Sequence, residues 1–439
     1  MSVRIIAEKA RAAAREFMLI NSNLKRNALH SIAKALNMHR KEILSENKKD
    51  CDAAALTNLP NALIKRLMLD DIKINELVTM VTSLAQGDDP CGKVLEKVEL
   101  DKGLILEKVA VPIGVIGVIF ESRPDALVQI AALALQSGNA VILKGGSESM
   151  RSNRIIAQIM SDATAQFSVP KEWLQILETR EQVKEMLELH DYIDLLIPRG
   201  SNEFVRYIME HTSIPVLGHA SGVCTIYVDE EADKDTALKI CYDAKVQYPA
   251  ACNAVENLLV HRACAREFLE KAVPLYLKEC VELRCDDASE RIARSVCTEE
   301  KKNLVKKASE KDWSTEYNDL VLSIKIVEDV SEAVSFINTY GSHHTDAIAT
   351  TNKATAEFFL NAVDSSSVFL NCSTRFSDGY RYGKGAEVGI STMKIHARGP
   401  VGVEGLMIYK YKLMGSGHIV SSYTGKNAKP FIHRKMTMS

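Results

Sequence analysis

The chain has 439 residues, of which 46% are hydrophobic and 26% are charged, so it can form two or three domains with substantial cores. Its 55 basic and 57 acidic residues nearly cancel, which argues against nucleic acid or a membrane surface as the main partner. No apolar run is long enough to span a bilayer, and residues 1–17 have the pattern of an amphipathic helix, so we expect a cytoplasmic protein. Because the ten cysteines include no CxxC pair, we expect reduced thiols and no metal site.

The predicted elements begin with helices over residues 1–86, separated by polar connections at 46–52 and 58–61. Residues 93–111 then alternate apolar and polar side chains on both sides of Gly103, which is typical of a β-hairpin. Because a free two-stranded ribbon is only marginally stable in water, we expect this hairpin to pair with another chain or to pack on the body.

From residue 113 onward, short aliphatic strands alternate with helices, which predicts open parallel sheets with helices on both faces. We expect one series of strands in GVIGVIF, AVILK, WLQIL and IDLLIP, and a second in ENLLVH, SIKIV, DAIAT and SSVFL. The predicted fold class is therefore α/β, with two successive doubly wound domains. Ligand sites in such folds lie beyond the carboxyl ends of the strands and between domains.

Cys252 lies in QYPAACNAVENL, between a helix expected over residues 233–246 and a strand that begins near Val255. Pro249 ends the helix because proline lacks an N–H donor and restricts the residue before it. Cysteine is among the most buried residue types, so a small core residue is the alternative interpretation. Functional residues concentrate in loops, and this position therefore favours a functional thiol.

Two strand-to-helix turns combine a cation with small residues, LKGGS at Lys144 and PRGS at Arg199. Each alone is typical of an ordinary turn, but on neighbouring strands of one sheet they favour a nucleotide, because helix N-termini receive anions. The sequence has no GxGxxG motif, and the P-loop spacing from Gly87 to Lys93 fails because valine follows the lysine.

Longer motifs resemble one known family: VPIGVIGVIFESRPD, LKGG, IPRGSN, YPAACN, TRFSDGYRYGKGAEVGIST and HARGPVGVEGL. They are similar to the gamma-glutamyl phosphate reductases, a unit that also forms half of the bifunctional pyrroline-5-carboxylate synthases. The resemblance implies an aldehyde-dehydrogenase-like fold with a β-arm for oligomerisation. The expected domains are an NADPH-binding domain at 1–245 that includes the hairpin at 93–111, a catalytic domain at 246–395, and a C-terminal return and oligomerisation segment at 396–439.

The resemblance also implies the reaction, in which NADPH reduces L-glutamyl 5-phosphate to L-glutamate 5-semialdehyde and phosphate, the second step of proline biosynthesis from glutamate. Cys252 is implied as the nucleophile that forms a thioester, and a thiolate can displace phosphate from an activated acyl phosphate. The alternative is a general NAD(P)-dependent semialdehyde dehydrogenase. Hydrolytic members carry a glutamate that activates water, and the equivalent PVLGH at 215–219 has no carboxylate, so we expect reduction.

The resemblance assigns further residues to the site. Arg123 aligns with an oxyanion-stabilising asparagine, with a helix-capping arginine as the alternative. Lys144 aligns with a lysine that contacts the adenosine ribose, and Ser147 replaces a glutamate of NAD-preferring relatives, which leaves room for NADPH. Ser201 is implied near the pyrophosphate, and Glu387 at the nicotinamide ribose or, alternatively, on the surface.

The substrate offers a phosphate, an α-carboxylate and an ammonium group. Arg375, Arg381 and Arg398 are the candidate partners of the two anions, because arginine suits bidentate oxyanion recognition. Asp378 is the candidate partner of the ammonium group. Solvated loop side chains are the alternative for each of these residues.

Beyond this small-molecule substrate, we expect a stand-alone subunit of a homo-oligomer, either a dimer or a tetramer, with a functional link to glutamate 5-kinase. His219 and His396 are expected to be structural histidines.

Overall fold

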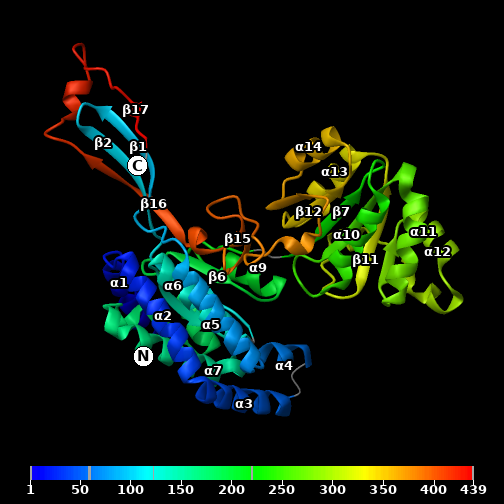
Figure 1. Cartoon of the computed structure of the whole chain (residues 1–439), viewed down its shortest axis with the longest axis horizontal. Coiled ribbons are helices and arrows are strands. Elements are labelled where there is room, and N and C mark those ends of the chain that lie inside the picture. The colour runs from blue at the N-terminus through cyan, green and yellow to red at the C-terminus, as the bar shows by residue number, and fades with distance from the viewer. Residues whose placement is uncertain (1, 58–60, 122, 219–220, 438–439) are drawn as a thin grey trace.

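In the computed structural model, the described residues 2–57, 61–121, 123–218 and 221–437 form two α/β units and a protruding arm (Figure 1). The first unit begins with α1 (Val3–Phe17), α2 (Ser22–Met38), α3 (Arg40–Leu56), α4 (Asn61–Leu67) and α5 (Asp71–Gln86). Of the helices within the described ranges, none has the length and apolar character that a membrane crossing needs.

Residues 46–52, predicted as a polar connection, lie within α3, so that prediction is wrong. Polar side chains in this segment form hydrogen bonds with the start of α7 (Met150–Thr164). Asp50 accepts a hydrogen bond from the backbone N–H of Ser152 at 2.8 Å. Asn47 donates to the hydroxyl of Ser152 at 3.1 Å. Both side chains are buried, because they satisfy polar groups at the start of the neighbouring helix.

The first sheet is parallel and has the order β5-β4-β3-β6. Its strands are β3 (Val115–Ile119), β4 (Ala140–Lys144), β5 (Leu174–Leu177) and β6 (Leu195–Pro198), with helices α6 (Pro124–Ser137), α7, α8 (Arg180–Leu187) and α9 (Asn202–Glu210) between and after them. Every residue of β3 and β4 is buried, because helices cover both faces of the sheet. The four predicted strands of the first series are therefore confirmed.

The second sheet is also parallel, with the order β10-β9-β11-β8-β7-β12-β13. Its strands are β7 (Cys224–Val228), β8 (Val255–His261), β9 (Glu282–Cys285), β10 (Val305–Lys307), β11 (Val321–Val327), β12 (Thr345–Ala349) and β13 (Ser367–Leu370). Its helices are α10 (Lys234–Val246), α11 (Arg262–Lys278), α12 (Asp287–Val296), α13 (Val330–Tyr340) and α14 (Lys353–Ala362). The strands predicted in the second series are confirmed, and β7, β9 and β10 are additional.

The boundary predicted between residues 245 and 246 does not match the sheets. β7 and α10 precede it, yet β7 pairs with both β8 and β12 of the second sheet. Toward the other end, Ala386 and Val388 lie inside the predicted catalytic segment 246–395 but pack into the core of the first unit. The chain therefore enters the second unit before Cys224 and returns to the first by Ala386.

The predicted hairpin is present and forms half of the arm. Strands β1 (Val94–Asp101) and β2 (Leu104–Pro112) pair with β16 (Met407–Met414) and β17 (Arg434–Lys435) in an antiparallel sheet of order β16-β2-β1-β17. Figure 1 shows this arm extending away from both units. Near its base, β14 (Gly389–Ser391) and β15 (Gly399–Val401) form a separate two-stranded ladder.

Candidate functional site

Cys252 lies on the loop between α10 and β8, at the amino edge of the second sheet. In the first sheet, strand β6 ends immediately before Arg199, which therefore lies at the carboxyl edge of that sheet. The Arg199 side chain and the Cys252 thiol interact electrostatically. The carboxyl edge of one sheet therefore faces the amino edge of the other, and Cys252 is partly exposed there.

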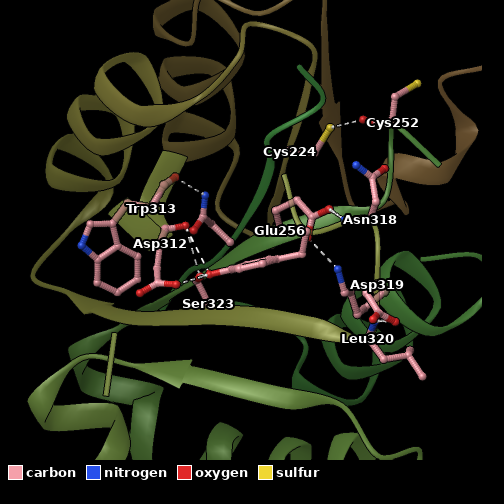
Figure 2. A network of polar contacts seen from close by, with 12 residues as sticks. Cys224, Cys252, Glu256, Asp312, Trp313, Asn318, Asp319, Leu320 and Ser323 are labelled. Atoms are coloured by element: carbon pink, nitrogen blue, oxygen red, sulfur yellow. Dashed lines mark hydrogen bonds and ion pairs between the residues drawn. The ribbon is translucent and has the colours of Figure 1, made fainter. Parts of the chain in front are cut away.

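Two hydrogen bonds hold the loop that carries Cys252, and Figure 2 shows the one from Cys224. The Cys224 thiol donates to the carbonyl oxygen of Cys252 at 3.4 Å, and the amide of Asn253 donates to the carbonyl oxygen of Ser377 at 2.8 Å. In Figure 2 the sulfur of Cys252 points away from Cys224 and from the polar network around Glu256. The loop backbone is therefore anchored, while the sulfur of Cys252 lies outside these contacts.

A buried ion pair joins the helix before this loop to the strand after it. Lys245 on the last turn of α10 places its Nζ 2.6 Å from Oε2 of Glu256 on β8, and both side chains are almost completely enclosed. The backbone N–H of Asn318 donates to the other oxygen of Glu256 at 3.4 Å. The two elements that flank Cys252 are thus joined by a charge-assisted hydrogen bond.

Four charged side chains act on the Cys252 thiol. Burial raises the pKa of Cys252 to about 12, and the carboxylates of Glu387 and Glu316 raise it as well. The guanidinium groups of Arg199 and Arg375 act in the opposite direction and lower this pKa. Because burial and the carboxylates prevail, the group at neutral pH is the thiol and not the thiolate.

Of the two carboxylates, the sequence predicted only Glu387. Glu387 accepts a hydrogen bond from the backbone N–H of Gly379 at 2.8 Å, and burial raises its pKa. Glu316 lies between the second-unit helical turn at Glu310–Ser314 and β11, and its Oε2 accepts from the Asn202 side chain of α9 at 2.8 Å. This hydrogen bond joins the two units beside the thiol. Glu316 is therefore a carboxylate near the thiol that comes from outside residues 215–219.

The two arginines from the first unit differ in their partners. Arg123 occupies the N-cap position of α6 without a capping hydrogen bond from its side chain. Its Nη2 lies 2.8 Å from Oδ2 of Asp125, and its guanidinium also interacts electrostatically with Glu387. Arg199 was singled out in the sequence only as part of the PRGS turn. Its Nη1 is buried and has no hydrogen-bond partner among the residues that the structure describes.

The residues predicted to bind the cofactor lie on the first unit. Lys144 ends β4, and burial lowers its pKa. Ser147 is exposed in the helical turn that follows, and Ser201 caps α9 by accepting from the N–H of Phe204 at 3.4 Å. The next residue after Ser147, Glu148, was missed: its carboxylate raises the pKa of Lys144 and therefore lies near that ammonium group.

Three of the four residues predicted to bind substrate lie together. The guanidinium of Arg375 donates to the side chain of Gln247 at 3.0 Å, and Arg381 donates to the backbone carbonyl of Arg375 at 2.9 Å. Asp378 accepts the backbone N–H of Arg381 at 3.1 Å.

Arg398, the fourth predicted residue, lies against Asp364, to which its Nη2 donates at 3.1 Å. His396 forms a hydrogen bond with the carbonyl oxygen of Gly405 at 2.7 Å, and His219 falls outside the described residues.

Comparisons with known proteins agree with this geometry. Residues 1–316 match the family model described as Aldehyde dehydrogenase family. The gamma-glutamyl phosphate reductase of Methanosarcina mazei is 53% identical over 98% of this chain and 96% of its own, and that of Acetivibrio thermocellus is 51% identical over 99% of each. The crystal structure of gamma-glutamyl phosphate reductase from Thermotoga maritima superposes with a TM-score of 0.91, at 37% identity, over 95% of this chain and 100% of that one.

Proposed function

The chain belongs to the gamma-glutamyl phosphate reductases of the aldehyde dehydrogenase family, and from this membership we propose that it reduces L-glutamyl 5-phosphate to L-glutamate 5-semialdehyde and phosphate, in proline biosynthesis. One observation carries the proposal. Cys252 is a partly exposed residue on an anchored loop, and charged groups from both units act on its thiol.

The chemistry of Cys252 follows from its surroundings. Its sulfur attacks the acyl carbon, the sulfur–carbon bond forms, the carbon–oxygen bond to the phosphoryl group breaks, and phosphate leaves with that electron pair. The thiol proton leaves with it as hydrogen phosphate, which suits a thiol whose pKa is raised to about 12. The positive charges of Arg199 and Arg375 favour the developing thiolate during attack.

The residues at the edge of the first sheet fit a nicotinamide dinucleotide, which supplies the hydride that the acyl group accepts. Lys144 and Ser147 lie where the adenosine ribose is expected, and Ser201 begins α9, whose first N–H groups suit a pyrophosphate. We assign NADPH as the preferred form because Ser147 is neutral. The neighbouring carboxylate of Glu148 acts on Lys144 and would repel the 2′-phosphate of NADPH. The cofactor preference therefore depends on both Ser147 and Glu148.

A second candidate function is oxidation of a semialdehyde to an acid, and Glu316 favours it. Its carboxylate acts on the Cys252 thiol, and a carboxylate in this position is the kind of group that activates water. However, one oxygen of Glu316 already accepts a hydrogen bond from Asn202. NADP⁺ reduction by glutamate 5-semialdehyde that continues without phosphate would identify this second function. The reductase instead requires phosphate for turnover in that direction.

Replacement of Cys252 tests the nucleophile. Cys252→Ala should abolish NADPH oxidation by L-glutamyl 5-phosphate while NADPH binding, followed by fluorescence titration, is retained. The control is Cys51→Ala, which removes another partly exposed thiol in the first unit and should keep turnover. Turnover by Cys252→Ala would refute the assignment.

The arm is assigned to homo-oligomerisation, in a dimer or tetramer. Several of its apolar side chains are exposed to solvent, among them Ile408, Tyr411, Leu413 and Phe431. Exposed apolar patches of this kind mark interaction surfaces. The first unit is assigned to the cofactor and the second to Cys252, while the link to glutamate 5-kinase stays a prediction.

A further inference from the structure

Arg199 has an unusual environment for an arginine. Its Nη1 is buried without a hydrogen-bond partner, and the side chain forms no ion pair within 4.0 Å among the residues that the structure describes. A buried guanidinium donor that is left unpaired costs free energy, so native proteins rarely keep one without a reason. At a reactive centre, a ligand that supplies the missing acceptor is such a reason.

The other arginines near the thiol already have partners. Arg123 is paired with Asp125 at 2.8 Å, and Arg375 donates to Gln247 at 3.0 Å. Arg199 differs from both in that its unpaired donor, Nη1, is buried and has no partner among the residues that the structure describes.

The position of Arg199 is fixed by the fold. Its backbone N–H donates to the carbonyl oxygen of Ile119 at 2.7 Å, which anchors it at the end of β6. Its side chain runs over Gly389, where a Cβ would lie 3.8 Å from Nε. The side chain of Arg199 therefore lies at van der Waals distance from this glycine.

Arg199 lies at the reacting centre. It interacts electrostatically with Cys252 and Glu387, whereas the charges that act on Lys144 include those of Glu148 and Arg180. An anion at Arg199 is therefore closer to the acyl group than to the adenosine end of a dinucleotide.

We propose that Arg199 binds the phosphoryl oxygens of the acyl phosphate and of the phosphate released from it. This assignment rests on the proposed function. The guanidinium offers paired N–H donors that match two phosphoryl oxygens. In thioester formation it stabilises the negative charge that the departing phosphate gains when the carbon–oxygen bond breaks. In the reverse direction it holds phosphate as a phosphate oxygen attacks the thioester and the sulfur leaves as thiolate.

The reverse reaction tests acylation of Cys252 separately from binding of phosphate at Arg199. Without phosphate, glutamate 5-semialdehyde and NADP⁺ should give a burst of about one NADPH per active site, because the acyl group stays on Cys252. Added inorganic phosphate should then release the acyl group and allow turnover. The variants are Arg199→Met and Arg199→Lys, with Arg206→Met as the control because Arg206 is an exposed cation on the same turn-to-helix segment.

We expect Arg199→Met to give a measurable burst but to raise the KM for inorganic phosphate at least tenfold, with Arg199→Lys between it and the parent. The KM for NADP⁺ should stay within about twofold, and Arg206→Met should match the parent protein. Inorganic phosphate should also raise the thermal midpoint of the parent but not that of Arg199→Met, since only a ligand that binds the folded state stabilises it.

The outcomes are distinct. An unchanged KM for phosphate in Arg199→Met overturns the proposal, and so does a rise confined to the KM for NADP⁺, which would place the pyrophosphate of the cofactor at this residue. Absence of the burst in the parent protein would instead refute the proposed function.

Discussion

Replacing Glu256 by glutamine tests how the interior beneath the Cys252 loop is held together. Lys245 Nζ lies 2.6 Å from Oε2 of Glu256, and the two side chains are 0% and 1% exposed. Glutamine preserves the size of the side chain but leaves the ammonium group of Lys245 buried without a counter-charge. Removal of one partner from such a pair typically costs about 3–5 kcal/mol. We therefore expect the free energy of unfolding of the second unit to fall by about 3 kcal/mol.

The two tryptophans make this measurable, because Trp173 lies in the first unit and Trp313 in the second. In a Trp173→Phe background, Trp313 fluorescence during urea titration reports on the second unit. Since burial raises the pKa of Glu256 to about 7, the titration is run at about pH 8, where the carboxylate predominates. The control is Arg266→Gln, which removes an ion pair whose side chains are 83% and 43% exposed and should change stability by less than about 0.5 kcal/mol.

A double variant completes the test. Lys245→Met combined with Glu256→Gln removes both charges, so it should recover most of the stability that Glu256→Gln loses. A loss below about 1 kcal/mol in the single variant would refute the reasoning, since it would mean that water reaches Lys245. A double variant as unstable as Glu256→Gln would show that shape, and not charge pairing, holds the loop.

Three further outcomes are expected. Glu387→Gln removes a carboxylate that raises the pKa of Cys252, so alkylation of this thiol by iodoacetamide at neutral pH should accelerate severalfold, and an unchanged rate would contradict the electrostatic account. Ser147→Glu should lower kcat/KM for NADPH about tenfold without a matching loss for NADH, whereas Glu148→Gln should shift the preference toward NADPH; steady-state kinetics with both cofactors would expose an error in either direction. Leu413→Lys places a charge on a side chain that is 58% exposed on the arm, and sedimentation velocity should show a smaller assembly; an unaltered sedimentation coefficient would remove Leu413 from the contact.

Local sequence patterns predicted the first sheet well because its strands are continuous aliphatic runs between helices. β9 was missed because ELRC alternates charged and apolar residues over only four positions, too short for a clear period. The domain boundary was misplaced because the Cys252 loop looked like a junction, while membership of the second sheet depends on the pairing of β7 with β8 and β12. Pairing between distant segments leaves no local signal.

The site was predicted unevenly for the same reason. Motifs predicted Cys252 and Glu387, and the Glu387 carboxylate acts electrostatically on the Cys252 thiol in the structure. Glu316 stands in a segment without a motif and reaches the thiol only because β11 lies next to β8. The PRGS turn at Arg199 was a weak indication of an anion site. That its Nη1 is buried without a partner depends on the packing of distant segments, which the sequence does not reveal.

The arm joins residues 94–112 to residues 407–435. During synthesis, the early hairpin must therefore wait for almost all of the later chain before its two outer strands exist. Any partner that recognises the four-stranded form can dock only after both α/β units have been translated. An assembly that depends on the four-stranded arm would then include only full-length chains, because truncated chains lack β16 and β17.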